Sequence, residues 1–162
     1  MKTLHKNPIT VMGKELDIGA SAPDFTLIDN DLKKRVLSDF KKDYLLLSIV
    51  PSLDTGVCDF QTRNINEKLA AFNNVDFVTV SMDLPFAQKR WCGSAGLNVI
   101  TLSDYQSGEF GLNYGVLIKE LRLLARAVLV FDQKRKLVYK EYLEEMGNHP
   151  NYDKLMEFLT NL

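Results

Sequence analysis

The fold is decided by the stretch SIVPSLDTGVC, residues 48–58. An apolar run from Tyr44 to Val50 leads into it, and a run of this length with almost no polar residue is typical of a strand buried on both faces of a sheet. Pro51 ends the strand, and a short polar loop leads to Cys58, after which apolar residues recur at helical spacing. A cysteine at this junction lies beside unpaired first-turn N–H groups and the positive end of the helix dipole. The stretch therefore predicts a site suited to a thiolate.

Length and composition predict an ordinary globular protein. The 162 residues suffice for one core, so we expect a single domain over residues 1–162. With 46% hydrophobic residues, 25% charged residues and a net charge of -1, the chain is neither disordered nor broadly basic. Residues 1–8 contain no signal-peptide core, and no stretch approaches about 20 apolar residues. We therefore expect a cytoplasmic protein with no nucleic-acid partner and no membrane partner.

Two cysteines, Cys58 and Cys92, are too few for a disulfide scaffold and are either incidental core residues or redox-active thiols. Neither belongs to a Cys-x-x-Cys pair, which argues against a general disulfide oxidoreductase. Four residues, none of them glycine, separate Cys58 from Arg63, whereas a tyrosine-phosphatase loop has five. The cysteines, His5 and His149 lack metal-ligand spacing, so we expect neither a metal nor another cofactor.

The chain beyond Cys58 predicts a parallel pair of strands. Ile65, Leu69 and Phe72 recur three and four residues apart on one helix face, and an apolar strand follows over residues 76–82. Strand, helix and strand in this order form a right-handed crossover. The Cys58 loop then lies at the carboxyl edge of the sheet, where ligands usually bind.

The flanking segments complete an α/β pattern. At the N-terminus, residues 4–16 predict a small β-hairpin that turns at Met12-Gly13-Lys14. The elements expected after residue 82 are, in order, a helix over Pro85–Gly93 closed by Cys92, a strand over 98–103, a helical turn over 108–114, a hairpin of strands 127–131 and 137–142, and a last helix opened by Pro150. This order predicts a thioredoxin-like fold, a central mixed sheet flanked by helices with an N-terminal β-hairpin.

Three motifs match a known family. The pattern Pro51-x-x-x-Thr55-x-x-Cys58 resembles the active-site signature of peroxiredoxins, and the whole run PSLDTGVC is similar to that of bacterial thiol peroxidases, the Tpx subfamily of atypical 2-Cys peroxiredoxins. The segment LPFAQ (84–88) with Cys92 resembles the part that carries the resolving cysteine, and LARAV (124–128) resembles the arginine strand. The resemblance spans essentially the whole chain.

The resemblance implies a peroxidase acting on hydrogen peroxide and organic hydroperoxides. Cys58 is the expected peroxidatic cysteine, and Cys92 the resolving cysteine that joins it in an intramolecular disulfide. Pro51, Thr55 and Arg126 are the expected supporting residues of the site. The resemblance also implies thioredoxin as the reductant and a homodimer formed next to the active-site loop. Residues 115–123 depart from the family because they lack the usual glycine-proline before the arginine strand.

Each residue also has a purely structural interpretation. Cys58 and Cys92 are of a type that is often simply buried, and Arg126 can reach the sheet edge to pair with an acid. Thr55 can cap the helix, and Pro51 can end the strand. The alternative function on the same scaffold is a non-catalytic thiol redox sensor or interaction protein.

Overall fold

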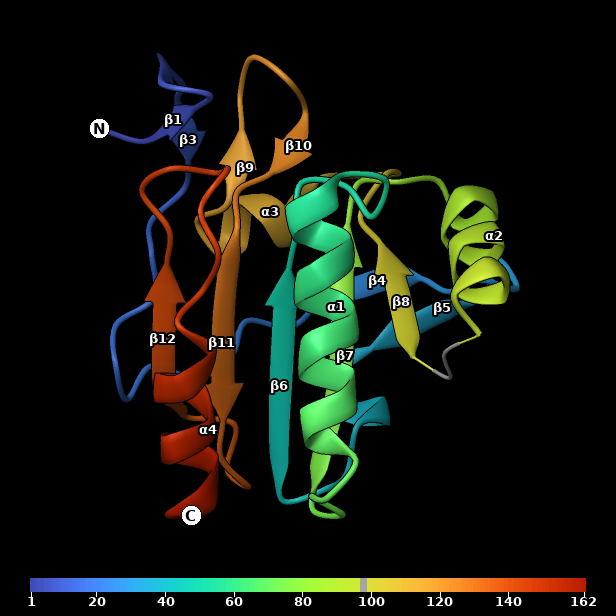
Figure 1. The fold of residues 1–162 in the computed structure, drawn as a ribbon, viewed down its shortest axis with the longest axis vertical. Helices are drawn as coiled ribbons and strands as arrows, with labels where there is room; N and C mark the ends of the chain where they lie inside the picture. Colours follow the sequence, from blue (N-terminus) through green and yellow to red (C-terminus); the bar gives the residue numbers. More distant parts are fainter. Residues whose placement is uncertain (97–98) are drawn as a thin grey trace.

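A seven-stranded mixed sheet forms the centre of the protein in the computed structural model, which describes residues 1–96 and 99–162 (Figure 1). Its strands are, in spatial order, β12 (Leu137–Tyr142), β11 (Ala127–Phe131), β6 (Tyr44–Ile49), β7 (Val75–Ser81), β8 (Ile100–Ser103), β4 (Thr26–Ile28) and β5 (Lys34–Val36). The central strands β6, β7 and β8 are parallel. The outer strands join antiparallel, β11 to β6 and β12, and β4 to β8 and β5.

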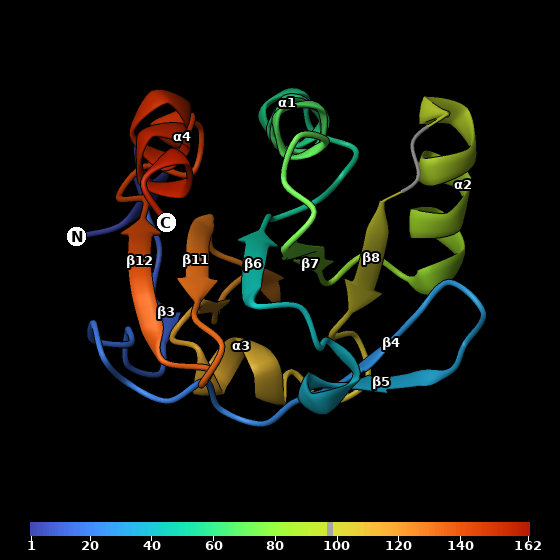
Figure 2. The ribbon, with the colours of Figure 1, turned by 90° about the horizontal axis from the view of Figure 1, so that it is seen from below.

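Helices cover both faces of this sheet (Figure 2). One face carries α1 (Gly56–Leu69), α2 (Pro85–Ala95) and α4 (Tyr152–Thr160), and the other carries α3 (Glu109–Asn113) and the 3₁₀ turn η1 (Leu37–Asp39). The predicted α/β fold, a mixed sheet between helices, is confirmed. No helix within the described ranges has the length and apolar content that a membrane span requires.

Strand β6 is buried on both faces, as its continuous apolar sequence predicts. Leu45 and Leu47 point into the core that contains Phe110 of α3. Leu46 points the opposite way, into the core that contains Ile65 of α1. Successive side chains of a strand alternate between faces, so only a strand covered on both sides needs an unbroken apolar run.

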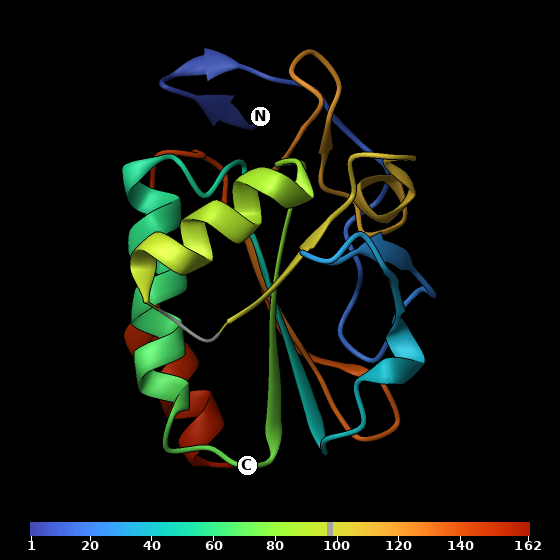
Figure 3. The same cartoon turned by 90° about the vertical axis from the view of Figure 1, so that its right-hand side faces the viewer.

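Helices α1 and α2 begin at the carboxyl edge of the parallel strands, on the same face of the sheet (Figure 3). This is the edge at which the sequence predicts the Cys58 loop. Helix α2 is longer than predicted, because Gly93 lies inside it and the helix ends at Gly96, whose φ of 64° gives a left-handed C-cap. Cys92 therefore lies within α2 and does not close it. The strand predicted over 98–103 is β8, and Asn98 lies outside the described residues.

The N-terminal hairpin exists, but its predicted turn is wrong. Strands β1 (Thr3–Leu4) and β2 (Asn7–Pro8) pair around His5 and Lys6, which have φ of 50° and 68°. Strand β3 (Val11–Met12) instead pairs with β9 (Leu117–Ile118), which also pairs with β10 (Leu123–Leu124). Glycine is required at position 13 because the backbone near Leu112 packs closely against it, and not because a hairpin turns there. A Cβ at Gly13 would lie 2.1 Å from the Leu112 carbonyl oxygen.

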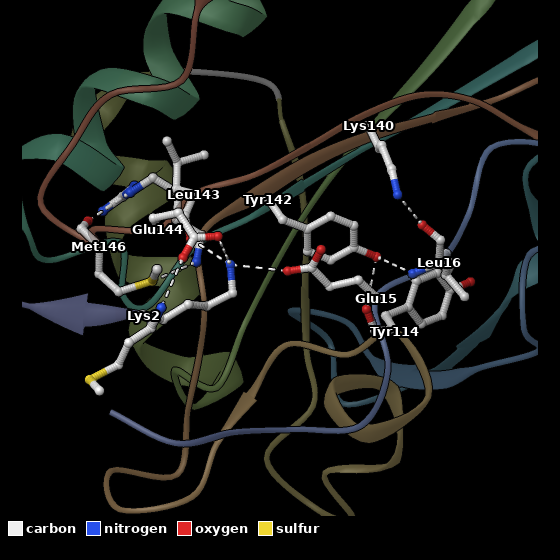
Figure 4. A network of polar contacts seen from close by, with 11 residues as sticks. Lys2, Glu15, Leu16, Tyr114, Lys140, Tyr142, Leu143, Glu144 and Met146 are labelled. Carbon is white, nitrogen blue, oxygen red and sulfur yellow. Dashed lines mark hydrogen bonds and ion pairs between the residues drawn. The ribbon is translucent and has the colours of Figure 1, made fainter. Parts of the chain in front are cut away.

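Polar contacts fasten the N-terminal segment to β12 and to the chain that follows it (Figure 4). The Tyr142 hydroxyl accepts from the Leu16 N–H at 3.0 Å and donates to the Tyr114 carbonyl at 3.0 Å. Burial raises the pKa of Tyr142 to about 12, which keeps its hydroxyl protonated as a donor. Lys2 Nζ donates to the Leu143 carbonyl at 2.8 Å, and the Met146 N–H donates to the Thr3 carbonyl at 2.8 Å. These bonds hold the segment around Met146 against the N-terminal segment, and the Leu143 N–H joins it to the Arg126 carbonyl at 3.1 Å.

The last helix begins later than predicted. Pro150 precedes it, and Asn151 is the N-cap, with its side chain accepting from the Lys154 N–H at 3.0 Å. The helix begins after Asn151 because this side chain satisfies one of the free N–H groups of the first turn.

Candidate active site

Cys58 occupies the third position of α1 and is fully buried. Its Sγ accepts a hydrogen bond from Arg126 Nη2 at 3.1 Å. Thr55 is the N-cap of α1, but its side chain makes no capping hydrogen bond, so the first-turn N–H groups have no side-chain cap. The sulfur therefore lies next to both a guanidinium and the positive end of a helix, the two features that favour a thiolate.

Arg126 immediately precedes β11 and is only 2% exposed. Besides Cys58, its guanidinium donates to Gln61 Oε1 at 2.9 Å and to the Met146 carbonyl at 2.9 Å. No ion pair joins Arg126 to a carboxylate within residues 1–96 and 99–162. The structural alternative for Arg126, a head group that reaches the sheet edge to pair with an acid, is therefore wrong. A buried cation with only neutral partners favours an anion at the remaining position, which is the Cys58 sulfur.

Gln61 holds Arg126 in this position, and sequence reasoning missed it. The side chain is fully buried and donates from Nε2 to Ser48 Oγ at 2.7 Å while its oxygen accepts from Arg126. Gln61 follows Cys58 by three residues, and a three-residue spacing places both side chains on one helix face. The sequence signal that could have revealed this role is a polar side chain, Gln61, on the helix face that is otherwise apolar.

An acid at the end of β7 shapes the loop before Cys58. Asp83 accepts from Ser52 Oγ at 2.7 Å and from the Leu53 N–H at 2.8 Å. Ser81 Oγ donates to the same carboxylate at 2.8 Å. Pro51 is buried at the start of this loop, two residues after the end of β6. Asp83 was also absent from the sequence prediction, because nothing in a lone aspartate shows which loop it faces.

Thr55 lies at the exposed side of the loop. Its hydroxyl donates to the Ser52 carbonyl at 3.1 Å, so its oxygen keeps lone pairs available as acceptors. A hollow of about 300 Å³ opens here, lined by Leu53, Asp54, Thr55, Gly56, Asp59 and Trp91. Cys58, one residue before Asp59, is fully buried and is not among the residues that line the hollow.

Cys92 is half-buried on α2, and both cysteines are free thiols. Its Sγ lies 3.6 Å from Thr101 Oγ1 and 3.9 Å from Asn30 Nδ2. Cys92 also packs against the small apolar cluster that contains Cys58 and Trp91. The structure thus brings the two cysteines to one cluster, although each sulfur contacts a different set of polar partners.

Tyr152, the first residue of α4, borders the Cys58–Arg126 pair. Burial raises the pKa of its hydroxyl to about 12, with the Arg126 charge acting against this rise and the Cys58 charge adding to it. The hydroxyl lies 3.1 Å from His149 Nδ1, and the ring lies 5.7 Å from the Phe60 ring. A neutral aromatic group thus covers this side of the site.

The residues described contain no cluster of three or more histidine, cysteine or acidic side chains able to hold a metal ion. The chemistry available at the site is therefore that of a thiol, a guanidinium and free helix N–H groups.

Comparisons with known proteins give the family of the chain. The Redoxin family model matches residues 17–156. A thiol peroxidase of Oceanobacillus iheyensis is 51% identical over 159 residues, covering 98% of this chain and 97% of the relative. A thiol peroxidase of Bacillus subtilis is 50% identical over 156 residues, covering 96% and 93%.

Solved structures share the fold over nearly the whole chain. A peroxiredoxin-like protein from Aquifex aeolicus is 38% identical, with a TM-score of 0.91 and coverage of 99% of this chain and 95% of that one. A thiol peroxidase from Chromobacterium violaceum, 20% identical, gives the same TM-score and the same coverage.

Removing Gln61 should weaken the folded protein. In Gln61→Leu, the buried Arg126 Nη1 and the Ser48 hydroxyl lose their partner, and we expect the free energy of unfolding to fall by about 1–3 kcal/mol. Urea denaturation at pH 7 measures this. The control Glu67→Gln, on an exposed position of the same helix, should stay within about 0.5 kcal/mol of the unmodified protein. Equal stability of Gln61→Leu and the control would contradict the role given to Gln61.

Proposed function

The chain belongs to the thiol peroxidases of the Redoxin family, and on this premise we propose that it reduces hydroperoxides at Cys58 and regenerates the thiol through Cys92. The observation that carries the proposal is the buried Arg126, which donates to the Cys58 sulfur and has no carboxylate partner among the described residues. A thiolate is the anion that this cation lacks, and the thiolate is the nucleophilic form of cysteine.

In the first step the Cys58 thiolate attacks one oxygen of the peroxide. A sulfur–oxygen bond forms, the oxygen–oxygen bond breaks, and the departing oxygen takes a proton to leave as water or an alcohol. Cys58 is oxidised by two electrons to a sulfenic acid. Arg126 and the uncapped N–H groups of the first turn of α1 stabilise the charge that develops on the oxygens.

Thr55 and Pro51 support this step. Because the Thr55 hydroxyl donates to the Ser52 carbonyl, its oxygen is free to accept the hydrogen of the peroxide and thus to orient it. Pro51, buried beside the cysteine turn, keeps water from the thiolate. The hollow over this turn has room for hydrogen peroxide and small organic hydroperoxides, with Leu53 and Trp91 as apolar walls.

In the second step Cys92 resolves the sulfenic acid. Its thiolate attacks the Cys58 sulfur, hydroxide leaves and becomes water, and an intramolecular disulfide remains. A disulfide requires a Cα separation of roughly 4.4–6.8 Å, and each sulfur now contacts different partners, so joining them requires one of the two helical turns to unwind. A dithiol protein must then reduce the disulfide. Thioredoxin is the proposed reductant, and the cytoplasm the proposed location, because thioredoxin helps to keep the thiols of cytoplasmic proteins reduced.

One equivalent of peroxide should convert the reduced protein to a form that is lighter by two hydrogen atoms. Mass spectrometry of the intact chain and of its peptides measures this and shows whether Cys58 and Cys92 are joined. Cys58→Ser should not react. Cys92→Ser should gain one oxygen atom as a sulfenic acid that dimedone traps, and a disulfide-like loss of mass in either variant would contradict the assigned roles.

Catalytic turnover separates the enzyme from the alternative, a redox sensor. With thioredoxin, thioredoxin reductase and NADPH, we expect peroxide to be consumed in many equivalents per chain, measured by NADPH oxidation. Cys92→Ser should lose this turnover. If the unmodified chain consumed one equivalent and stopped, thioredoxin would not be its reductant and the sensor function would be favoured.

We further propose a homodimer formed next to the active-site loop. Leu84 and Phe86, at the start of α2, are 52% and 67% exposed, and Asp83 directly before them holds the loop residue Leu53. Exposed apolar side chains in one place are typical of a protein interface.

The oligomeric state tests this surface. Sedimentation at micromolar concentration should show a dimer, and Phe86→Glu should show a monomer because a buried charge would oppose association. Leu121→Glu, at a leucine that is also exposed, is the matched control and should remain a dimer. A monomeric unmodified protein would exclude the proposed assembly.

A further inference from the structure

A direct hydrogen bond joins the helix segments that carry the two cysteines. Asp59 follows Cys58 in α1, and Trp91 precedes Cys92 in α2. The Trp91 indole N–H donates to Asp59 Oδ1 at 2.8 Å. Trp91 is 9% exposed and packs against Cys58 in the small apolar cluster. The residues next to the two thiols are therefore bonded to each other while the thiols are not.

Arg63 completes this contact. Its Nε donates to the second oxygen of Asp59 at 2.9 Å, one helical turn along α1. Its guanidinium lies 5.5 Å from the centre of the Trp91 ring, within the range of a cation–π contact. Asp59 thus binds α2 with one oxygen and its own helix with the other. Both bonds involve a charged group, which makes them stronger than bonds between neutral groups.

Formation of the disulfide must disturb this contact. The Cys58 sulfur is bound to Arg126 beside β11, whereas the Cys92 sulfur lies against Thr101 of β8, with β6 and β7 between those strands. Cys58 is the cysteine whose displacement unwinds less of its helix, because it lies in the first turn of α1, whereas Cys92 lies well inside α2. Asp59 is the next residue, and its N–H closes the first turn on the Thr55 carbonyl at 2.9 Å, so unwinding through Cys58 displaces the Asp59 carboxylate from Trp91.

We propose that Asp59 and Trp91 are positioning residues that hold Cys58 in its helical position beside Arg126 and thereby set the rate of disulfide formation. This inference rests on the proposed function. The step itself is unchanged: the Cys92 thiolate forms a bond to the sulfenic sulfur of Cys58, hydroxide leaves as water, and no further reactant is needed. The contact keeps the thiolate in place for peroxide and delays the encounter with Cys92. A longer-lived sulfenic acid is also open to a second peroxide, which makes a sulfinic acid.

Rapid-quench mass spectrometry after one equivalent of peroxide tests the proposal, because it follows sulfenic acid and disulfide separately. Asp59→Ala and Trp91→Phe each remove the hydrogen bond, and each should form the disulfide about tenfold faster, the factor expected for one lost bond to a charged group. The double variant should be no faster than either single variant, because both remove the same bond. Formation of the sulfenic acid should not become faster.

A matched control separates the bond from the charge. Glu67→Ala removes an exposed carboxylate from the same helix as Asp59, outside the hollow and without a bond to Trp91, and its disulfide should form at the unmodified rate. At a large excess of peroxide, Asp59→Ala and Trp91→Phe should yield less sulfinic acid than Glu67→Ala. A merely structural weakening of the protein would not speed resolution and lower sulfinic acid together.

The outcomes that overturn the inference are distinct from failure of the proposed function. Disulfide formation at equal rates in the unmodified protein, Asp59→Ala and Trp91→Phe would overturn it, and so would equal acceleration by Glu67→Ala. If Asp59→Ala does not fold, Trp91→Phe, which keeps an aromatic ring in the cluster, decides by itself. If the unmodified protein forms no Cys58–Cys92 disulfide, the proposed function fails, and the inference fails with it.

Discussion

The contact between the Arg126 guanidinium and the Cys58 sulfur is the interaction on which the site depends. Arginine stays protonated in proteins, and burying a charge without a partner costs several kcal/mol. The described chain offers Arg126 only neutral acceptors besides Cys58, namely Gln61 and the Met146 carbonyl. The remaining donor of the guanidinium is directed at one sulfur, so a buried cation lies in hydrogen-bond contact with a buried cysteine.

The sheet places this cation and this thiol together. Ala127 of β11 pairs with Ile49 of β6, so Arg126 lies at the edge of the sheet level with Val50, where the chain leaves β6 for the cysteine loop. On the other side of β6, the parallel strand β7 ends before Asp83, which binds the same loop. The site is thus built between two neighbours of one central strand. The contacts around Met146 extend this frame to the N-terminal segment, which is peripheral in the chain but helps to hold an acceptor of Arg126.

The start of α1 has two opposing requirements. It must be ordered to hold the thiol beside Arg126, and in the proposed cycle it must unwind. Its capping is weak for an ordered helix, since Thr55 makes no side-chain cap, and such a cap typically contributes about 1 kcal/mol. The Asp59 contacts to Trp91 and Arg63, one turn further along the helix, stabilise the helical conformation. Segments that move in function usually have low local stability. At the start of α1, the local stability depends on the missing side-chain cap at Thr55 and on the contacts of Asp59.

The sequence by itself determined the elements whose signals are local. The apolar run of β6, the parallel pairing with β7 and the hairpin of β11 and β12 follow from periodicity and turn residues within short windows. Pro51, Thr55 and Cys58 form a motif for the same reason. The ends of elements were less certain: Gly93 is tolerated inside α2, and only the left-handed conformation at Gly96 ends it. The N-terminal turn was misplaced, because Gly13 serves a contact with a distant segment.

Only the tertiary structure decided what surrounds the sulfur. The family resemblance names Arg126 as a supporting residue, but only the structure places its guanidinium on the Cys58 sulfur, 68 residues away, and on the Met146 backbone carbonyl, which no residue type encodes. Asp59 bonds to Trp91 across 32 residues, and in the sequence its carboxylate looks like any acid in a first helical turn. Hydrogen bonds depend on distance and direction between particular atoms, whereas sequence patterns report only burial and periodicity. The sequence therefore determined which cysteine is the candidate nucleophile and which strand leads to it, and the packing of distant segments decided which groups contact its sulfur and which contacts surround its helical turn.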